Sequence, residues 1–316
     1  MVRIADVAAH AGVSTATVSR VLNGVKVRSD LENRVRLAVA ELDYAPNRTA
    51  RSLRRQLSDV IALIIPDVEN PFFTSVARGV EDVARAAGLS VVLCNADDDV
   101  AKERLYLAVA EHENMAGVIL APAGDAAPDL SRLIRRDRAV VVIDRAVGED
   151  VDQVVFDNYS LGRRAAEGLI ARGHRDIACI TGPRTTPTAV ERATGWRDAL
   201  EEAGLSSSRL VYANFRVDGG RSAMADLLAA QTPPEAVLAT NNLVGVGVLQ
   251  VLAGRSGPHV DVGIIGDLPF ATSDVDEVFH LSLQPREMGV TAARLLVDRI
   301  HGSAAAPETK VLLGAP

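Results

Sequence analysis

From about residue 60 to the end of the chain, short apolar runs alternate with amphipathic helical stretches. The runs are apolar throughout, which is typical of strands in a parallel sheet that helices cover on both faces. They fall into two series of five, and this predicts an α/β core of two doubly wound parallel-sheet lobes. The expected strands are 60–65, 91–94, 117–121, 139–143, 153–156, 177–181, 210–213, 236–240, 262–265 and 281–284, and the expected helices are 76–87, 102–113, 159–171, 190–203, 221–230 and 286–301.

The pattern before residue 45 is helical. Ile4 opens a run of apolar residues at i, i+3, i+4 and i+7, and Gly12 directly after this run favours a sharp stop. Ser14 is placed to cap a second helix over residues 15–22. A helix, a glycine turn and a second short helix predict an N-terminal all-α helix-turn-helix headpiece, in which the start of the second helix reaches base edges in the major groove of DNA.

A third headpiece helix is expected to begin near Ser29 or Asp30, with Ser29 and Glu32 forming a capping box. The small core between the three helices is expected to contain Val18, Val21, Leu22, Val35, Leu37, Ala38 and Leu42. Any three-helix bundle shows such periodicity, so the pattern alone does not establish DNA binding.

The distribution of charge favours DNA binding. Residues 1–57 contain ten Lys or Arg and five Asp or Glu, a net charge of +5, whereas the whole chain carries −7 and the remainder therefore −12. Cations that approach the phosphate backbone release condensed counterions, so a basic headpiece on an acidic protein is typical of a DNA-binding module.

Composition sets the broad class. A chain of 316 residues with 48% hydrophobic and 24% charged residues is expected to form two or three globular domains. Cys94 and Cys179 lie in apolar runs, and we expect buried free thiols in a reducing compartment. No export signal or membrane-spanning run is recognised, so the expected location is the cytoplasm, in association with the nucleoid when DNA is bound.

Catalytic and cofactor motifs are missing from the sequence. It has no dinucleotide-binding or Walker-type glycine loop and no nucleophilic serine elbow, and its six histidines are dispersed. We interpret Gly245 and Gly247 as packing positions, His174 as part of a helix end, and residues 97–99 as an acidic loop that starts a helix. The chain is therefore expected to be neither an enzyme nor a metal or cofactor protein.

The segment from Ile4 to Leu53, IADVAAHAGVSTATVSRVLNGVKVRSDLENRVRLAVAELDYAPNRTARSL, resembles the DNA-binding headpiece of the lactose-repressor (LacI) family. The resemblance implies a hinge helix at about 47–55, which orders on operator binding and inserts Leu53 into the minor groove. Core packing beneath a linker is the alternative role for this leucine. The residues that the resemblance assigns to DNA binding are Ser14, Thr15, Ala16, Thr17, Ser19, Arg20, Asn23, Asn47, Arg48, Ala50 and Leu53.

Within this set, Thr15, Ala16 and Arg20 are expected to read bases. The residues expected to hold phosphates are Ser14, Thr17, Ser19, Asn23 and Arg48.

The rest of the chain resembles the periplasmic-binding-protein-like core of the same family, through residues 67–73, 155–158, 172–175, 182–183 and 283–285. The implied domains are the headpiece, 1–57, and an effector-binding and dimerisation core, 58–316. The implied N-lobe is about 58–158 plus 286–301, and the implied C-lobe is about 159–284 plus 309–313. The chain departs from the family at residues 266–270, which are two residues shorter than usual. It also ends early, at Pro316, without a leucine-heptad tail.

The resemblance also implies an effector site. Arginine can clamp hydroxyls or a carboxylate, while Asp and Asn bond hydroxyls and aromatic rings cover the apolar face of a sugar or base. The implied residues are Phe72, Phe73, Asp144, Thr188, Arg192, Phe215, Asn241 and Asp267. The alternatives are a core role for Phe72 and Phe73, and a surface helix charge for Arg192.

Together these features predict a ligand-responsive transcription regulator, a repressor that binds double-stranded operator DNA as a homodimer. Its small-molecule effector is expected to be a sugar or a related polyhydroxy compound, with a purine as the alternative. A periplasmic-type sugar-binding protein without a role on DNA shares the two-lobed fold, as would an enzyme built on the same lobes. The basic headpiece argues against both.

Overall fold

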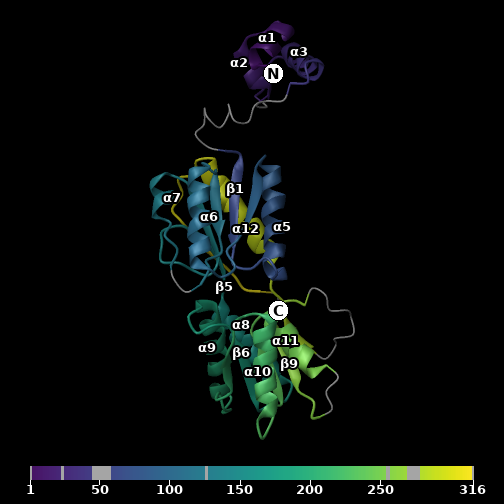
Figure 1. The fold of residues 1–316 in the computed structure, drawn as a ribbon, viewed down its shortest axis with the longest axis vertical. Helices are drawn as coiled ribbons and strands as arrows, with labels where there is room; N and C mark the ends of the chain where they lie inside the picture. The colour runs from purple at the N-terminus through teal and green to yellow at the C-terminus, as the bar shows by residue number, and fades with distance from the viewer. Residues whose placement is uncertain are drawn as a thin grey trace. The chain divides into compact units, whose positions relative to one another are not determined.

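The computed structural model describes residues 2–22, 25–44, 58–124, 127–253, 257–268 and 278–314 (Figure 1). The chain forms two compact units, Met1–Ser58 and Asp59–Pro316. The expected hinge helix at 47–55 lies outside the described residues. So do five of the predicted DNA-binding residues, namely Asn23, Asn47, Arg48, Ala50 and Leu53.

The first unit contains a helix-turn-helix followed by a third helix. Gly12 ends the first helix in the left-handed region, with φ 61°, and its N–H reaches the carbonyls of that helix. The Ser14 hydroxyl accepts a hydrogen bond from the Thr17 N–H at 3.2 Å, so Ser14 caps the second helix as predicted. The helices are α1 Ile4–Ala11, α2 Thr15–Leu22 and α3 Ser29–Glu41.

Two expectations about the third headpiece helix are wrong. Val18 and Val35 are fully buried, but Leu37 is 62% exposed. Successive helical residues are about 100° apart, so Leu37, two positions after Val35, falls on the opposite face of α3. The predicted capping box is also wrong, because Arg28 is the N-cap of α3 and the Glu32 carboxylate pairs with Arg36 instead, at 2.7 Å.

The second unit begins with a lobe built on a six-stranded sheet of order β11–β5–β4–β3–β1–β2, in which all pairs are parallel. Alternate residues of β1 face opposite layers: Ile61 packs with α5 and α12, while Ala62 packs with α6 and α7. The elements are β1 Val60–Ile65, α5 Pro71–Ala86, β2 Ser90–Asn95, α6 Val100–His112, β3 Gly117–Leu120, α7 Ser131–Arg135, β4 Ala139–Asp144, β5 Asp152–Phe156, α12 Pro285–Ile300 and β11 Thr309–Leu312.

The second lobe is built on a five-stranded parallel sheet of order β10–β9–β8–β6–β7. Helices α8 and α9 cover one face and α10 and α11 the other. The two doubly wound lobes are as predicted. The elements are α8 Asn158–Ala171, β6 Ile177–Thr181, α9 Pro187–Glu202, β7 Leu210–Tyr212, α10 Val217–Ala229, β8 Ala236–Ala239, α11 Asn242–Leu252, β9 Asp261–Ile265 and β10 Val278–Leu281.

Two expectations about the end of the chain are wrong. The strand at 309–312 belongs to the first lobe, because α12 packs beside α5 and the strand that follows α12 pairs with β5. Asp152 of β5 holds the connection from α12 to β11 in place, because it accepts two hydrogen bonds from Arg299 and one from the Glu308 N–H. The last strand of the second lobe is β10 rather than residues 281–284, since those residues run directly into Pro285 at the start of α12.

Glycines allow close approach of the helices that carry the site. Gly162 of α8 lies against the Arg192 carbonyl of α9, and an added Cβ would overlap that carbonyl. Gly247 of α11 approaches the Val217 carbonyl of α10 in the same way, which confirms the packing interpretation of this glycine. The α8–α9 crossing sets the position of Arg192. Among the described residues, no helix combines the length and apolar character that a membrane crossing requires.

Candidate functional site

The first turn of α2 offers an exposed surface for DNA. Thr15, Ala16 and Arg20, the residues expected to read bases, are all exposed, while Thr17 and Ser19 are half-buried. Because the hydrophobic side of α2 is buried through Val18 and Val21, this polar side is the one available to a groove. The geometry therefore suits the predicted recognition helix.

Several basic side chains of the headpiece have structural roles. Arg28 bonds Asp30 through two nitrogens, at 3.0 and 2.6 Å, and this hydrogen bond raises the pKa of the guanidinium. Arg34 donates to the Gly12 carbonyl at 2.9 Å and thereby ties α3 to the turn before α2. Arg20 and Lys26 are exposed on or just after the recognition helix. Lys26 is therefore placed to meet a phosphate, while Arg20 keeps its expected place among the residues that read bases.

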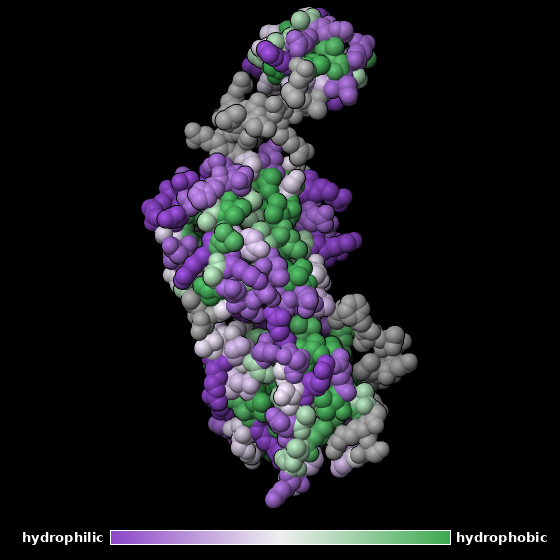
Figure 2. Space-filling view, in the orientation of Figure 1, coloured by the Kyte–Doolittle hydropathy of each residue, from purple (hydrophilic) through white to green (hydrophobic). Residues whose placement is uncertain are grey.

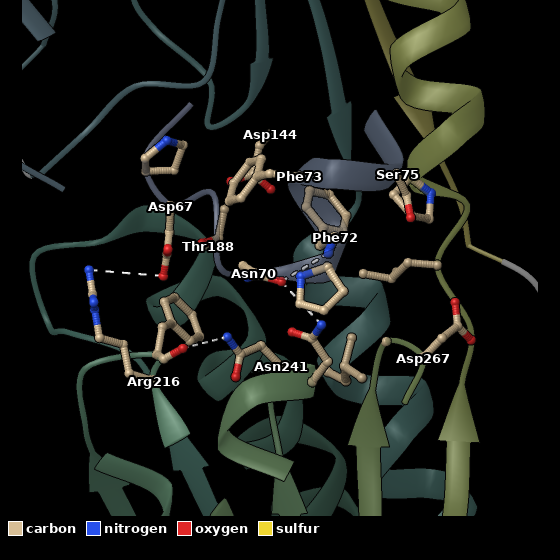
Figure 3. A pocket seen from close by; sticks show the side chains of 18 of the residues that line it. Asp67, Asn70, Phe72, Phe73, Ser75, Asp144, Thr188, Arg216, Asn241 and Asp267 are labelled. Carbon is tan, nitrogen blue, oxygen red and sulfur yellow. Dashed lines mark hydrogen bonds and ion pairs between the residues drawn. The ribbon is translucent and has the colours of Figure 1, made fainter. Parts of the chain in front are cut away.

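The effector residues implied by the resemblance gather in one cavity between the two lobes (Figure 3). In parallel sheets the carboxyl ends of the strands share one edge, and here the two sheets turn these edges toward each other. The first lobe contributes Phe72, Phe73 and Asp144. The second lobe contributes Thr188, Arg192, Phe215, Asn241 and Asp267, so all eight line the same space.

Arg192 lines this cavity and is buried, with 5% of its surface exposed. Its Nε donates to Asn158 Oδ1 at 2.9 Å and its Nη1 to the Thr240 carbonyl at 2.6 Å. The alternative of a surface helix charge is therefore wrong. Burial lowers the pKa of Arg192, and the nearby Asp144 carboxylate opposes that shift.

Asp144 faces Arg192 from the other lobe. Burial raises the pKa of this carboxyl, whereas Arg145 and Arg192 lower it. The backbone at Asp144 is left-handed, with φ 65°, which is costly for a residue other than glycine. A buried guanidinium and a carboxylate that is only 12% exposed, on opposite lobes, can together bond the donors and acceptors of a small polar molecule.

Asn241 and Phe215 hold each other in place. Asn241 caps α11, with its Oδ1 accepting from the Val244 N–H at 2.8 Å, and its Nδ2 donates to the Phe215 carbonyl at 2.9 Å. Phe215 has a left-handed backbone with φ 57°. Thr188 is buried in the first turn of α9, while Asp267 is exposed directly after Gly266. The polar wall of the cavity is thus largely preorganised.

The two adjacent phenylalanines combine both of their expected roles. Their rings meet edge to face with centroids 5.0 Å apart. Phe73 belongs to the hydrophobic core and Phe72 packs against that core, while both rings also line the cavity. They can therefore offer an apolar surface to a ligand without leaving the core.

Sequence reasoning missed further residues that line the cavity, among them Asp67, Asn70, Asp98, Arg145, Asn214, Arg216 and Asn242. A signal existed for some of them. Asn70 precedes Pro71 as the cap of α5 and accepts from the Phe72 N–H at 3.0 Å, and Arg145 and Arg216 each follow a predicted site residue. Polar neighbours of a residue at a strand end are natural candidates for the same cleft.

The acidic run at 97–99 does more than start a helix. Asp99 caps α6 as expected, accepting from the Ala101 N–H at 2.7 Å. Asp98 instead lies 3.4 Å from Arg145, and Asp97 pairs with Lys102 at 3.2 Å. The expectation of a merely solvated loop is therefore incomplete.

His174 follows the helix end formed by Gly173, and its ring approaches Asp261 at 2.5 Å.

The two cysteines, Cys94 and Cys179, are buried free thiols, and burial raises the pKa of both. Across the part of the chain that the structure describes, no group of three His, Cys, Asp or Glu side chains could hold a metal ion.

A helix-turn-helix module on the same chain as a two-lobed α/β core with a polar and aromatic cleft defines the class of ligand-binding transcription regulators. Residues 3–47 match the profile described as bacterial regulatory proteins, lacI family. Residues 58–305 match that of periplasmic binding proteins and the sugar binding domain of the LacI family. The chain belongs to the lacI family of bacterial regulatory proteins, which confirms the predicted family, fold and DNA-binding class.

Similar proteins are themselves regulators. The ribose operon repressor of Halalkalibacterium halodurans is 35% identical over 95% of this chain and 91% of its own length. The transcriptional regulator CelR of Thermobifida fusca is 36% identical over 97% of this chain and 94% of its own. A solved structure of a CelR–cellobiose complex is 32% identical to this chain and superposes with a TM-score of 0.71. The match covers 100% of this chain and 98% of the CelR chain. The prediction that the chain is not an enzyme is confirmed by these relatives.

Proposed function

We propose that this chain binds a pseudo-palindromic operator in double-stranded DNA as a homodimer, and that a neutral sugar in the cleft changes its affinity for the operator. It would then act as a cytoplasmic, sugar-responsive repressor. The observation that carries this proposal is that the buried Arg192 and the partly buried Asp144 line one cavity from different lobes. A ligand held by both residues has a different affinity for each arrangement of the lobes, as an effector must.

The charges of the cavity favour a neutral ligand. Four aspartates and three arginines line it, so the lining carries a net negative charge. Arg145 and Arg216 are already paired with aspartates, at 3.4 and 3.2 Å. A phosphorylated sugar would meet excess carboxylates, whereas the hydroxyls of a neutral sugar can both donate to Asp144 and accept from Arg192.

The similar proteins narrow the choice of sugar. One is named a ribose operon repressor, and the solved CelR structure holds cellobiose. Phe72, Phe73 and Phe215 can cover the apolar face of a sugar ring or stack on a base, so the rings alone do not exclude a purine. The several carboxylates favour hydroxyl donors, and D-ribose is therefore the first compound to test.

An apolar face on the first lobe supports the homodimer. The edge strand β2 exposes Val92 and Leu93, the latter by 43%, and α6 beside it exposes Leu105 by 60% and also Val109. Figure 2 shows apolar surface gathering on this lobe between α6 and α5. An uncharged edge strand of this kind is a template for pairing unless it is covered. We propose that a second copy of the chain covers this face, because a pseudo-palindromic operator is bound by a two-fold symmetric dimer.

Thermal unfolding with added ligands tests the proposed function. We expect D-ribose or another neutral sugar to raise the Tm of the full chain, by an amount equivalent to about 2.7 kcal/mol at a hundred times Kd. Ribose 5-phosphate and hypoxanthine serve as the anionic and purine comparisons, and cellobiose as the longer sugar. A rise in Tm with hypoxanthine alone would mean that the effector is a purine rather than a sugar. If no sugar raises the Tm, the proposal is contradicted.

A further inference from the structure

An ion pair joins the two lobes at one end of the cleft. Arg216, at the start of α10 in the second lobe, directs Nη2 to Asp97 Oδ1 at 3.2 Å and lies 3.9 Å from Asp67 Oδ2. Asp67 follows β1 and Asp97 follows β2, so both carboxylates belong to the first lobe. Figure 3 shows Arg216 and Asp67 facing each other across the cleft.

Both sides of this contact are anchored to the backbone. The Arg216 N–H donates to Asn214 Oδ1 at 3.0 Å, and the Asp67 Oδ1 accepts from the Glu69 N–H at 2.9 Å. Asp67 is buried, and Lys102 and Arg216 hold the pKa of Asp97 below its usual range. Because the buried Asp67 carboxylate is already fixed by its own hydrogen bond, its contact with Arg216 costs less side-chain entropy than an ordinary surface ion pair.

A second bond crosses the cleft without any charge. The Asn242 Nδ2, at the first residue of α11, donates to Asn70 Oδ1 at 3.1 Å. Asn70 is the cap of α5, so this bond joins the helix starts of the two lobes. The two cross-lobe contacts differ in one testable respect, since salt screens a partly exposed ion pair but not an amide hydrogen bond.

We propose that Arg216 is a positioning residue for the effector, because its pairing with Asp67 and Asp97 holds the lobes in the arrangement that brings Asp144 and Arg192 to one ligand. The inference rests on the proposed function, which supplies the neutral sugar. The apparent affinity of a ligand falls with the fraction of molecules in the binding-competent arrangement. We call the contact of Arg216 with the two aspartates the latch. Loss of the latch therefore weakens sugar binding without removing a contact to the sugar.

Calorimetric titration of D-ribose into the full chain tests the latch. We expect Arg216→Gln and Asp97→Asn each to weaken binding by about three- to tenfold, and the double variant to bind no more weakly than the worse single variant. Asp97 does not line the cavity but also pairs with Lys102, so the double variant is what shows that the effect of Asp97→Asn passes through Arg216. Arg221→Gln is the matched control, since Arg221 lies on the same helix and bonds Gln250 outside the cleft.

Salt provides a readout that a direct ligand contact would not move. The affinity of the wild type for the neutral sugar should fall as NaCl is raised from 50 to 500 mM, while that of Arg216→Gln stays constant. If Arg216→Gln weakens binding and Asp97→Asn does not, Arg216 contacts the sugar itself and the latch is overturned. Unchanged affinity in both variants overturns it as well.

A measurement without ligand separates this inference from the proposed function. Amide hydrogen exchange at the helix starts of the cleft, including the Phe72 and Val244 N–H groups, should be faster in Arg216→Gln than in the wild type and in Arg221→Gln. If the wild type binds no sugar, the proposed function fails while the exchange still tests the latch. Equal exchange rates in Arg216→Gln and the wild type would rule the latch out.

Discussion

Operator binding is expected to weaken about a thousandfold or more when the salt concentration rises from 50 to 200 mM. The headpiece carries a net charge of +5 on a chain of −7, and a homodimer presents it twice. Each phosphate neutralised by Lys or Arg releases a counterion, so the logarithm of the affinity falls linearly with the logarithm of the salt concentration. The expected slope is steep because several phosphates per subunit are involved.

Fluorescence anisotropy with a labelled duplex, enriched from a random pool by the full chain, measures this slope. Lys26→Ala should reduce the steepness of the slope by about two if Lys26 holds a phosphate, about one for each subunit of the homodimer. Arg221→Ala, an exposed arginine of the core, is the matched control and should leave the slope unchanged. An affinity that barely changes over this range would mean that the basic headpiece does not dock on phosphates.

Arg192→Ala is expected to weaken sugar binding by at least about a hundredfold and to abolish the thermal shift, because it removes the buried guanidinium that lines the cavity and leaves Asn158 and the Thr240 carbonyl without their donor. The variant should remain in one DNA-binding state whatever the sugar concentration. Its headpiece should still fold, since Arg192 lies in the other compact unit. The measurements are the Tm and the anisotropy of the bound duplex, each with and without sugar.

Two further variants separate this effect from a folding defect. Arg192→Lys keeps the charge but loses the planar fork that bonds Asn158 and Thr240, and it should also bind the sugar weakly. Arg197→Ala, on the same helix but outside the cavity, should respond to sugar as the wild type does. A normal response in Arg192→Ala would show that the effector binds elsewhere.

The two-lobed fold is readable from the sequence because its strands are buried on both faces. Runs such as Val60–Ile65 and residues 139–143 are apolar throughout, which leaves few alternatives to a covered parallel sheet. The edge strand β11 was assigned to the wrong lobe because its residues are mostly exposed and its partner β5 lies far away in sequence. Hydrophobic character alone does not place Leu37, because the helical angle puts this residue on the exposed face of α3.

The cleft likewise contains residues that the sequence predicts and contacts that it does not, because those contacts join residues far apart in the chain. Its eight expected residues came from the resemblance to the LacI family, which places each of them by its position along the chain. Arg216 and Asp97 are 119 residues apart, and Asn70 and Asn242 are 172 apart. Nothing local marks such pairs, because they meet only when the two lobes face each other. The left-handed backbones at Asp144 and Phe215 are likewise set by the folded lobes rather than by residue type.

The most direct test of the account is the affinity of the full chain for the sugar that gives the largest thermal shift, measured with and without saturating operator DNA. Linkage requires that DNA change the sugar affinity by the same factor as the sugar changes the DNA affinity. We predict that the two sugar affinities differ by about fivefold or more, the lower end of typical allosteric coupling. Equal affinities would contradict the account, since such a sugar could occupy the cleft without regulating the headpiece.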